Sequence, residues 1–214
     1  MRRMITMAIA IMIGSLLFAQ ENQNNEQQTL FGNKRGFGGF IGLNSQAAQI
    51  NGQEAYLTGA ELNMVLGHSL NIGVKGMGLV SDIESNTFND DGDAYKLQMG
   101  YGGVNIEPVI ASKSVLHVTT PLFLGIGGIA ETYDPLWEGD IINGVETAFD
   151  QKPHRTDMFL MAEPGVNLEL NVFKFMRLTG GVSYKFVTDT QIPGIETSDI
   201  EGLSANLSLR LGWF

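Results

Sequence analysis

The chain has 214 residues, of which 23 are acidic and 13 are basic, so its formal net charge is −10. It contains no cysteine, which excludes a disulfide framework and thiolate metal or redox sites. Glycine is abundant, with 27 residues. Beyond the N-terminal region, every apolar run is interrupted before it reaches the length of a membrane-spanning helix. The length suits one domain.

The N-terminal region has the pattern of a cleaved secretory signal peptide. Two arginines precede an apolar run from Met4 to Phe18, and a small residue, Ala19, stands just before the chain turns polar. We therefore predict a signal peptide over 1–19. Residues 20–34 are rich in Gln and Asn and have almost nothing to bury, which predicts a flexible segment ahead of the folded domain.

The C-terminal stretch, Leu203 to Phe214, alternates between apolar and polar residues. A period of two over about a dozen residues indicates a β-strand with two different faces, and the length suits a tilted membrane strand. Phe214 falls one step outside the apolar phase. We predict that the apolar face of this strand contacts lipid, through Leu207, Leu209, Leu211 and Trp213.

Eight long alternating segments follow the flexible lead-in, at 35–45, 54–67, 70–81, 94–110, 115–130, 157–172, 175–187 and 201–214. Their connections alternate between short links, at 67–69, 111–114 and 173–174, and longer ones, at 46–53, 82–93, 131–156 and 188–200. Short turns at one end and long loops at the other are typical of transmembrane barrels. The sequence thus predicts an all-β fold over 35–214, an eight-stranded antiparallel up-and-down transmembrane β-barrel. The alternative is a soluble barrel or sandwich with the apolar face turned inward.

The fourth segment, 94–110, has an irregular phase. Tyr95, Leu97, Met99 and Tyr101 form one apolar set, and the apolar positions then shift to Val104 and Ile106. We predict that both sets face outward and that a β-bulge at Gly102–Gly103 joins them. This assignment places Lys96 inside the barrel.

The charged residues predicted to face inward carry both signs. Eight strands leave an interior just wide enough for side chains to fill, and a charge in that space must be paired. We predict a salt-bridge network that closes the lumen, made of Glu61, Lys75, Lys96, Glu107, Glu163, Glu169, Arg177, Lys185 and Arg210. A polar conduit is the alternative, and it needs a wider lumen.

The long loops hold most of the acidic residues, and such a surface attracts cations. Asp90, Asp91 and Asp93 crowd around a glycine, as Ca²⁺ ligands do, but they lack the spacing of a known calcium loop, so a solvated turn is the preferred interpretation and we predict no metal site. The longest loop also carries Tyr133, Leu136 and Trp137, which indicate either a surface-interaction site or a lid over the barrel mouth.

No catalytic constellation is visible. The three histidines, His68, His117 and His154, are scattered over a short turn, a strand and a long loop, with no nucleophile in register at the outer rim. Gly125 to Gly128 lies inside a strand and has no helix after it, so it is not a nucleotide loop. We predict neither enzymatic activity nor a cofactor.

The predicted barrel and its closing aromatic pair, Trp213–Phe214, resemble the small eight-stranded outer-membrane barrels typified by outer-membrane proteins A and X. The Gly- and Asn-rich strands resemble the outer-membrane barrel domains of Bacteroidota-type bacteria. This resemblance implies an integral protein of the bacterial outer membrane, with both termini periplasmic and a structural, adhesive or surface-interaction role. It also implies outer-membrane lipid, lipopolysaccharide and the barrel-assembly machinery as partners, and no nucleic acid. Passive transport of small apolar solutes and lipid modification are the alternative functions.

Overall fold

The computed structural model describes residues 37–88, 94–112, 114–132, 155–188 and 195–214. The predicted signal peptide, 1–19, and the predicted flexible segment, 20–34, lie outside the described residues. The first strands are β1 (Phe37–Ile50), β2 (Gln53–Leu66), β3 (Leu70–Leu79), β4 (Glu84–Phe88) and β5 (Ala94–Ile110). They are followed by β6 (Leu116–Thr119), β7 (Leu122–Thr132), β8 (Arg155–Phe173), β9 (Met176–Val187), the short helix α2 (Thr197–Ile200) and β10 (Gly202–Trp213).

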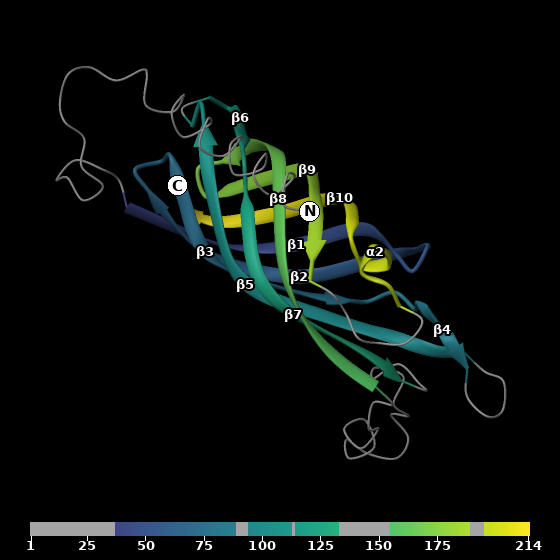
Figure 1. The fold of residues 1–214 in the computed structure, drawn as a ribbon. Coiled ribbons are helices and arrows are strands. Elements are labelled where there is room, and N and C mark those ends of the chain that lie inside the picture. Colours follow the sequence, from purple (N-terminus) through teal and green to yellow (C-terminus); the bar gives the residue numbers. More distant parts are fainter. Residues whose placement is uncertain (1–36, 89–93, 113, 133–154, 189–194) are drawn as a thin grey trace, which may run out of the picture.

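The strands form a closed antiparallel ring, in which β1 pairs with β2, β2 with β3, β3 with β5, β8 with β9 and β9 with β10, and β10 pairs back with β1 (Figure 1). β6 and β7 flank Thr120–Pro121 and pair with the same two strands, β5 and β8. They count as one strand of the ring, because proline has no N–H to give to the ladder but does not shift the register. The ring therefore has eight strands, as predicted, and β4 pairs with β5 outside it.

The long loop predicted at 46–53 is wrong. β1 continues to Ile50 and a two-residue turn, Asn51–Gly52, leads directly into β2. Both turn residues have positive φ values, 52° and 70°, and Asn-Gly is the pair that adopts such a hairpin turn most readily. The serine, glutamine and alanine residues at 45–49 hid the strand from a pattern based on large apolar residues in alternation. The longer connections elsewhere contain the extra elements β4 and α2.

The phase predicted for the start of β5 is also wrong. Lys75 pairs with Gly103 and Gly76 with Gly102 in one unbroken register, so there is no bulge at Gly102–Gly103. As a result the side chains of Leu97, Met99 and Tyr101 are buried inside the barrel. The physical reason is that a narrow barrel is filled by side chains, which need not be polar at every level.

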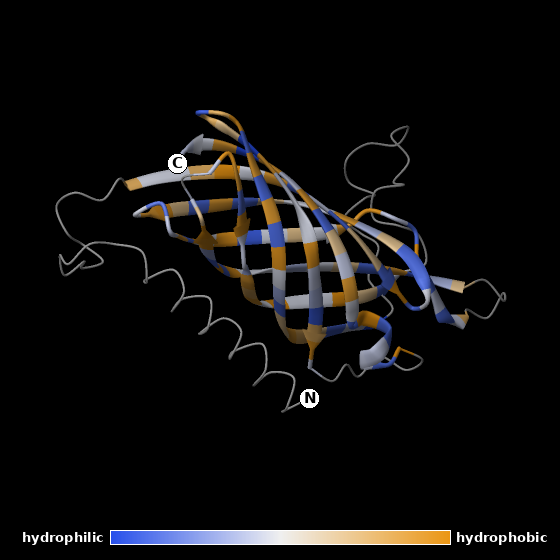
Figure 2. Cartoon of the chain, turned by 90° about the horizontal axis from the view of Figure 1, so that it is seen from above, coloured by the Kyte–Doolittle hydropathy of each residue, from blue (hydrophilic) through white to orange (hydrophobic). Residues whose placement is uncertain are grey.

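The outer face of the barrel is apolar and exposed. On β10 the exposed fractions of Leu207, Leu209, Leu211 and Trp213 are 55%, 38%, 42% and 81%, whereas Ser208 and Arg210 between them are buried. Figure 2 shows hydrophobic and hydrophilic positions alternating along the strands in view. This is the reverse of a soluble barrel, in which the apolar face is turned inward. Among the described residues, no helix is long and apolar enough to cross a membrane.

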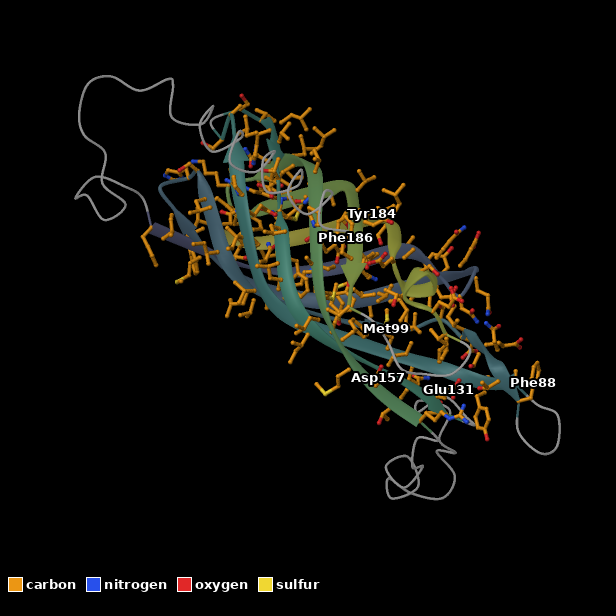
Figure 3. All side chains as sticks on the ribbon, in the orientation of Figure 1. Phe88, Met99, Glu131, Asp157, Tyr184 and Phe186 are labelled. Carbon is orange, nitrogen blue, oxygen red and sulfur yellow. The ribbon has the colours of Figure 1, made fainter. Side chains whose placement is uncertain are left out.

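Aromatic side chains lie on the outer face at both ends of this apolar surface. Phe37, Phe173, Phe175 and Trp213 are exposed at the end with the short turns. Tyr56 and Phe88 are exposed towards the other end, where the Tyr184 and Phe186 rings also pack together with centroids 4.6 Å apart (Figure 3). Aromatic residues at both interfaces are typical of membrane barrels.

The interior has two layers. Towards the loop end it is an apolar core, which includes Leu57, Met77, Leu97, Met99, Phe159 and Met161. Ile195 and Ile200, which flank and end α2, are buried in the same cluster, and the Asp199 carbonyl accepts a hydrogen bond from Asn51 N. Towards the turn end, most inward positions of the same strands are polar or charged, with a few apolar exceptions such as Val65 and Val109. The candidate site lies in that polar layer.

Candidate functional site

Arg210 is the centre of the polar layer. Its guanidinium donates to carboxylates from three strands: Nε to Glu61 Oε1 at 2.9 Å, Nη1 and Nη2 to the two oxygens of Glu107 at 2.7 and 2.8 Å, and Nη1 to Glu169 Oε2 at 2.5 Å. The Arg210 side chain is 3% exposed and the three carboxylates are equally inaccessible. A planar guanidinium has donors in several fixed directions, which is why arginine can join three strands at once.

Glu169 is shared between several donors. Arg177 Nη1 lies 2.7 Å from its Oε1, and His117 Nε2 lies 2.7 Å from the same oxygen. Thr179 Oγ1 donates to the other oxygen at 3.1 Å. The register does not place Glu169 directly opposite Arg177, because Thr179 occupies that position, and the ion pair forms diagonally across the two strands. The hydrogen bonds satisfy both oxygens of a buried carboxylate, which burial requires.

A second polar group lies between the Arg210 cluster and the apolar core. Glu163 Oε1 accepts hydrogen bonds from Gln46 Nε2 and Ser183 Oγ, and Gln46 Oε1 accepts one from the Tyr101 hydroxyl at 2.8 Å. Lys185 Nζ lies 5.1 Å from the centroid of the Tyr101 ring. Lys75 Nζ lies 5.5 Å from the centroid of the Phe123 ring instead of joining the Arg210 cluster.

Lys96 lies outside the lumen, contrary to prediction. It sits on the outer face near the loop end of β5, and its amino group lies 3.8 Å from Asp82, with 29% of the Lys96 side chain and 52% of the Asp82 side chain exposed. Lys96 faces outward because side chains alternate along a strand and the next residue of β5, Leu97, faces inward. The inward charges left from the predicted set are four carboxylates and four cations: Glu61, Glu107, Glu163, Glu169, Lys75, Arg177, Lys185 and Arg210.

Several members of the polar layer were not in the predicted network. Gln46 was placed in a loop, and Tyr101 was placed on the outer face. His117 lies opposite Glu169 in the ladder between β6 and β8, and this position joins it to the network. Asn63 and Asn71 donate to Glu61 and Glu107, respectively. The inward phase of β2 and β3 was the signal that could have found these two asparagines, had polar side chains been counted along with charged ones. It could not have found Gln46 or Tyr101, which were predicted to lie elsewhere.

Phe214 closes the turn end of the polar layer. Its ring lies under the guanidinium of Arg177, with Cζ 3.8 Å from the ring centroid, and its centroid is 5.4 Å from that of Phe40. Phe40 in turn packs against Arg210, whose Cζ lies 4.9 Å from the Phe40 centroid. The departure of Phe214 from the lipid-facing phase therefore has a structural consequence, because its ring covers Arg177 and packs against Phe40, which in turn covers Arg210.

We expect Phe214→Ala to lower the free energy of unfolding by about 1–2 kcal/mol, through loss of the cation–π contact with Arg177 and the ring contact with Phe40. Phe214→Tyr keeps the ring and should stay close to wild type. Urea unfolding of the refolded protein in detergent, followed by tryptophan fluorescence, measures both variants. Equal losses for Ala and Tyr would contradict a role for the ring.

The other predicted site residues lie outside the described residues. These are Asp90, Asp91 and Asp93, the weak metal candidates, and Tyr133, Leu136 and Trp137, the predicted surface-interaction residues. Within the part of the chain that the structure describes, no cluster of three or more histidines and acidic residues could hold a metal ion. The described loop end does contain a buried carboxylate, Glu131, which accepts hydrogen bonds from Ser85 and Thr87 of β4 (Figure 3).

The comparisons with known proteins concern the fold. No family model matches the sequence, and no curated protein matches it. Among solved structures, Neisserial surface protein A matches with a TM-score of 0.51 and 11% sequence identity, over 83% of this chain and 96% of that one. This chain is an eight-stranded transmembrane β-barrel of the outer-membrane type.

Two further solved structures resemble this barrel more loosely. The major outer membrane protein of Thermus thermophilus has a TM-score of 0.48 and 8% identity, over 82% of this chain and 99% of that one. Ail, the attachment invasion locus protein of Yersinia pestis, has a TM-score of 0.43 and 11% identity, over 84% and 98%. The match to Neisserial surface protein A supports the fold of a small outer-membrane barrel in general and singles out neither the protein A and X type nor the Bacteroidota type.

Proposed function

We propose that this protein is an integral barrel of the bacterial outer membrane that does not conduct ions and acts at the cell surface, in a structural, adhesive or interaction role. The observation that carries the proposal is the filled interior, in which the Arg210 cluster lies in series with the apolar core. Paired charges and close-packed apolar side chains both oppose the passage of hydrated ions. Neither layer holds a constellation for catalysis among the described residues, so we propose no enzymatic activity.

The surface role is supported by a sheet that continues past the ring at the loop end. The ladder between β3 and β5 ends at Gly78–Gly100, and the ladder between β8 and β9 ends at Met161–Val187. The β5–β7 and β7–β8 ladders continue to Lys96–Thr132 and Glu131–Arg155. Figure 1 shows these strands and β4 extending away from the rest of the barrel. We propose that this extension projects outward from the membrane and that its acidic neighbours, among them Glu54, Glu84, Glu196 and Asp199, keep it solvated.

The proposed orientation places both termini in the periplasm and the long loops outside. It agrees with the even number of ring strands and with the signal peptide predicted over 1–19. Outer-membrane lipid and lipopolysaccharide would contact the apolar wall, and the barrel-assembly machinery would act during insertion. No nucleic acid is a proposed partner.

Single-channel recording tests the proposal. The mature chain, refolded and inserted into planar lipid bilayers, should give no steady conductance under conditions in which a known porin gives open channels. Large stable channels would overturn the filled-lumen proposal and would favour a passive pore. Uptake of small apolar solutes by vesicles that contain the protein, without ion conductance, would favour the transport alternative.

A further inference from the structure

A small cavity of about 40 Å³ lies in the middle of the lumen. Its lining includes members of the Arg210 cluster, among them Arg210 itself. Further towards the apolar core, Lys75 lines it on β3, two residues before the buried Met77, and Glu163 lines it on β8, two residues from the buried Met161. The cavity therefore lies beside the Arg210 cluster, on the side of the apolar core.

Three polar atoms of the residues that line this cavity have no hydrogen-bond partner among the described residues. They are Glu163 Oε2, Asn167 Oδ1 and Asn44 Nδ2. Glu163 is 3% exposed and Asn167 is 7% exposed, so bulk solvent does not reach them. An unpaired buried polar atom costs free energy comparable to a lost hydrogen bond, and a carboxylate oxygen costs more. Three such atoms around one cavity indicate a shared partner.

The chemistry of the lining selects that partner. Two of the three atoms are acceptors and one is a donor, a combination that water satisfies and a metal ion does not. Lys75 and Arg210 line the same cavity, and they disfavour a cation. The volume and the polar lining exclude an apolar ligand. A site for one water needs roughly 10–15 Å³ and two to four polar partners, so the cavity has room for about three waters.

We propose that this cavity is a hydration site, in which about three ordered water molecules join Glu163, Asn167 and Asn44 and solvate Lys75. The inference rests on the proposed function, because a conducting lumen would fill this space with mobile solvent. It extends that function by dividing the barrel interior into three zones: a charged layer, a small hydrated space and a dry apolar layer.

Radiolytic footprinting in H₂¹⁸O distinguishes the zones with two matched phenylalanines. Phe123 lines the cavity and is 1% exposed, whereas Phe159 belongs to the apolar core and is 2% exposed. X-rays convert bound water into hydroxyl radicals in place, so we expect ¹⁸O incorporation at Phe123 to be several-fold faster than at Phe159. Equal protection of both rings would overturn the hydration site. Equal labelling of both rings without ion conductance would overturn the dry apolar layer and with it the division into zones, and equal labelling with conductance would instead refute the proposed function.

A pair of substitutions tests the same site by the sign of a stability change. Asn167→Leu removes an acceptor that water would use, so it should lower the urea midpoint of unfolding. If the cavity were dry, the same change would remove an unpaired buried atom and raise the midpoint. Thr119→Val is the control, because the Thr119 hydroxyl is buried and unpaired among the described residues but does not line the cavity, and its loss should leave the midpoint unchanged or higher. A higher midpoint for Asn167→Leu would contradict the proposal.

Discussion

Replacing Arg210 by methionine should lower the free energy of unfolding by about 3–5 kcal/mol, because it leaves three buried carboxylates without their shared cation. Glu61, Glu107 and Glu169 all contact this one guanidinium, and all three are buried. The loss is measured by urea unfolding of the refolded protein in detergent or lipid vesicles, with the mobility of unheated samples on gels as a second indicator of folding.

If these residues form one coupled network, a second substitution should restore part of the stability lost in Arg210→Met. Glu107 receives two of the Arg210 hydrogen bonds, and it also accepts one from Asn71 that a glutamine at this position could retain. Adding Glu107→Gln to Arg210→Met should therefore recover much of the loss, since it removes one stranded charge. Arg210→Lys should be intermediate, because lysine keeps the charge but lacks the planar set of donors. Additive losses in the double variant would contradict a coupled network.

The second large effect concerns the lipid-facing wall. Leu207 lies near the middle of β10 with 55% of its surface exposed, and Leu207→Arg should cost about 2–4 kcal/mol if that surface contacts hydrocarbon at the midplane. Leu203 lies on the same face at the loop end of β10 and is 71% exposed. Leu203→Arg should cost only about 0–1 kcal/mol, because an arginine near the interface can reach water and headgroups.

The comparison is made by reversible unfolding in lipid vesicles, where the depth of a residue has a meaning that it lacks in a micelle. Substituting the same residue at both positions makes the difference a measure of depth rather than of arginine itself. Small and equal costs would mean that this face contacts water, as it would in a soluble protein.

The sequence by itself determined the wall of the barrel. The alternation in β2, β8, β9 and β10 predicted which side chains face outward, because side chains of a strand alternate strictly and the two faces have different surroundings. It also predicted the number of ring strands and placed Glu169, Arg177 and Arg210 inside. It failed at β1, where the serine, glutamine and alanine residues at 45–49 carry little information about phase. It failed again at β5, where Leu97 and Met99 are apolar but face inward.

Only the tertiary structure decided which of the inward residues meet. Arg210 contacts Glu61, 149 residues earlier in the chain, and Glu107, 103 residues earlier. Those distances close only when β10 pairs with β1 and the register of every intervening strand is set, so no local pattern contains them. The ring also separated Lys75 and Lys185 from the Arg210 cluster, and the phase of β5 placed Lys96 on the outer face. Each strand specifies its own two faces, but the partners across the lumen depend on the sum of all registers around the closed ring.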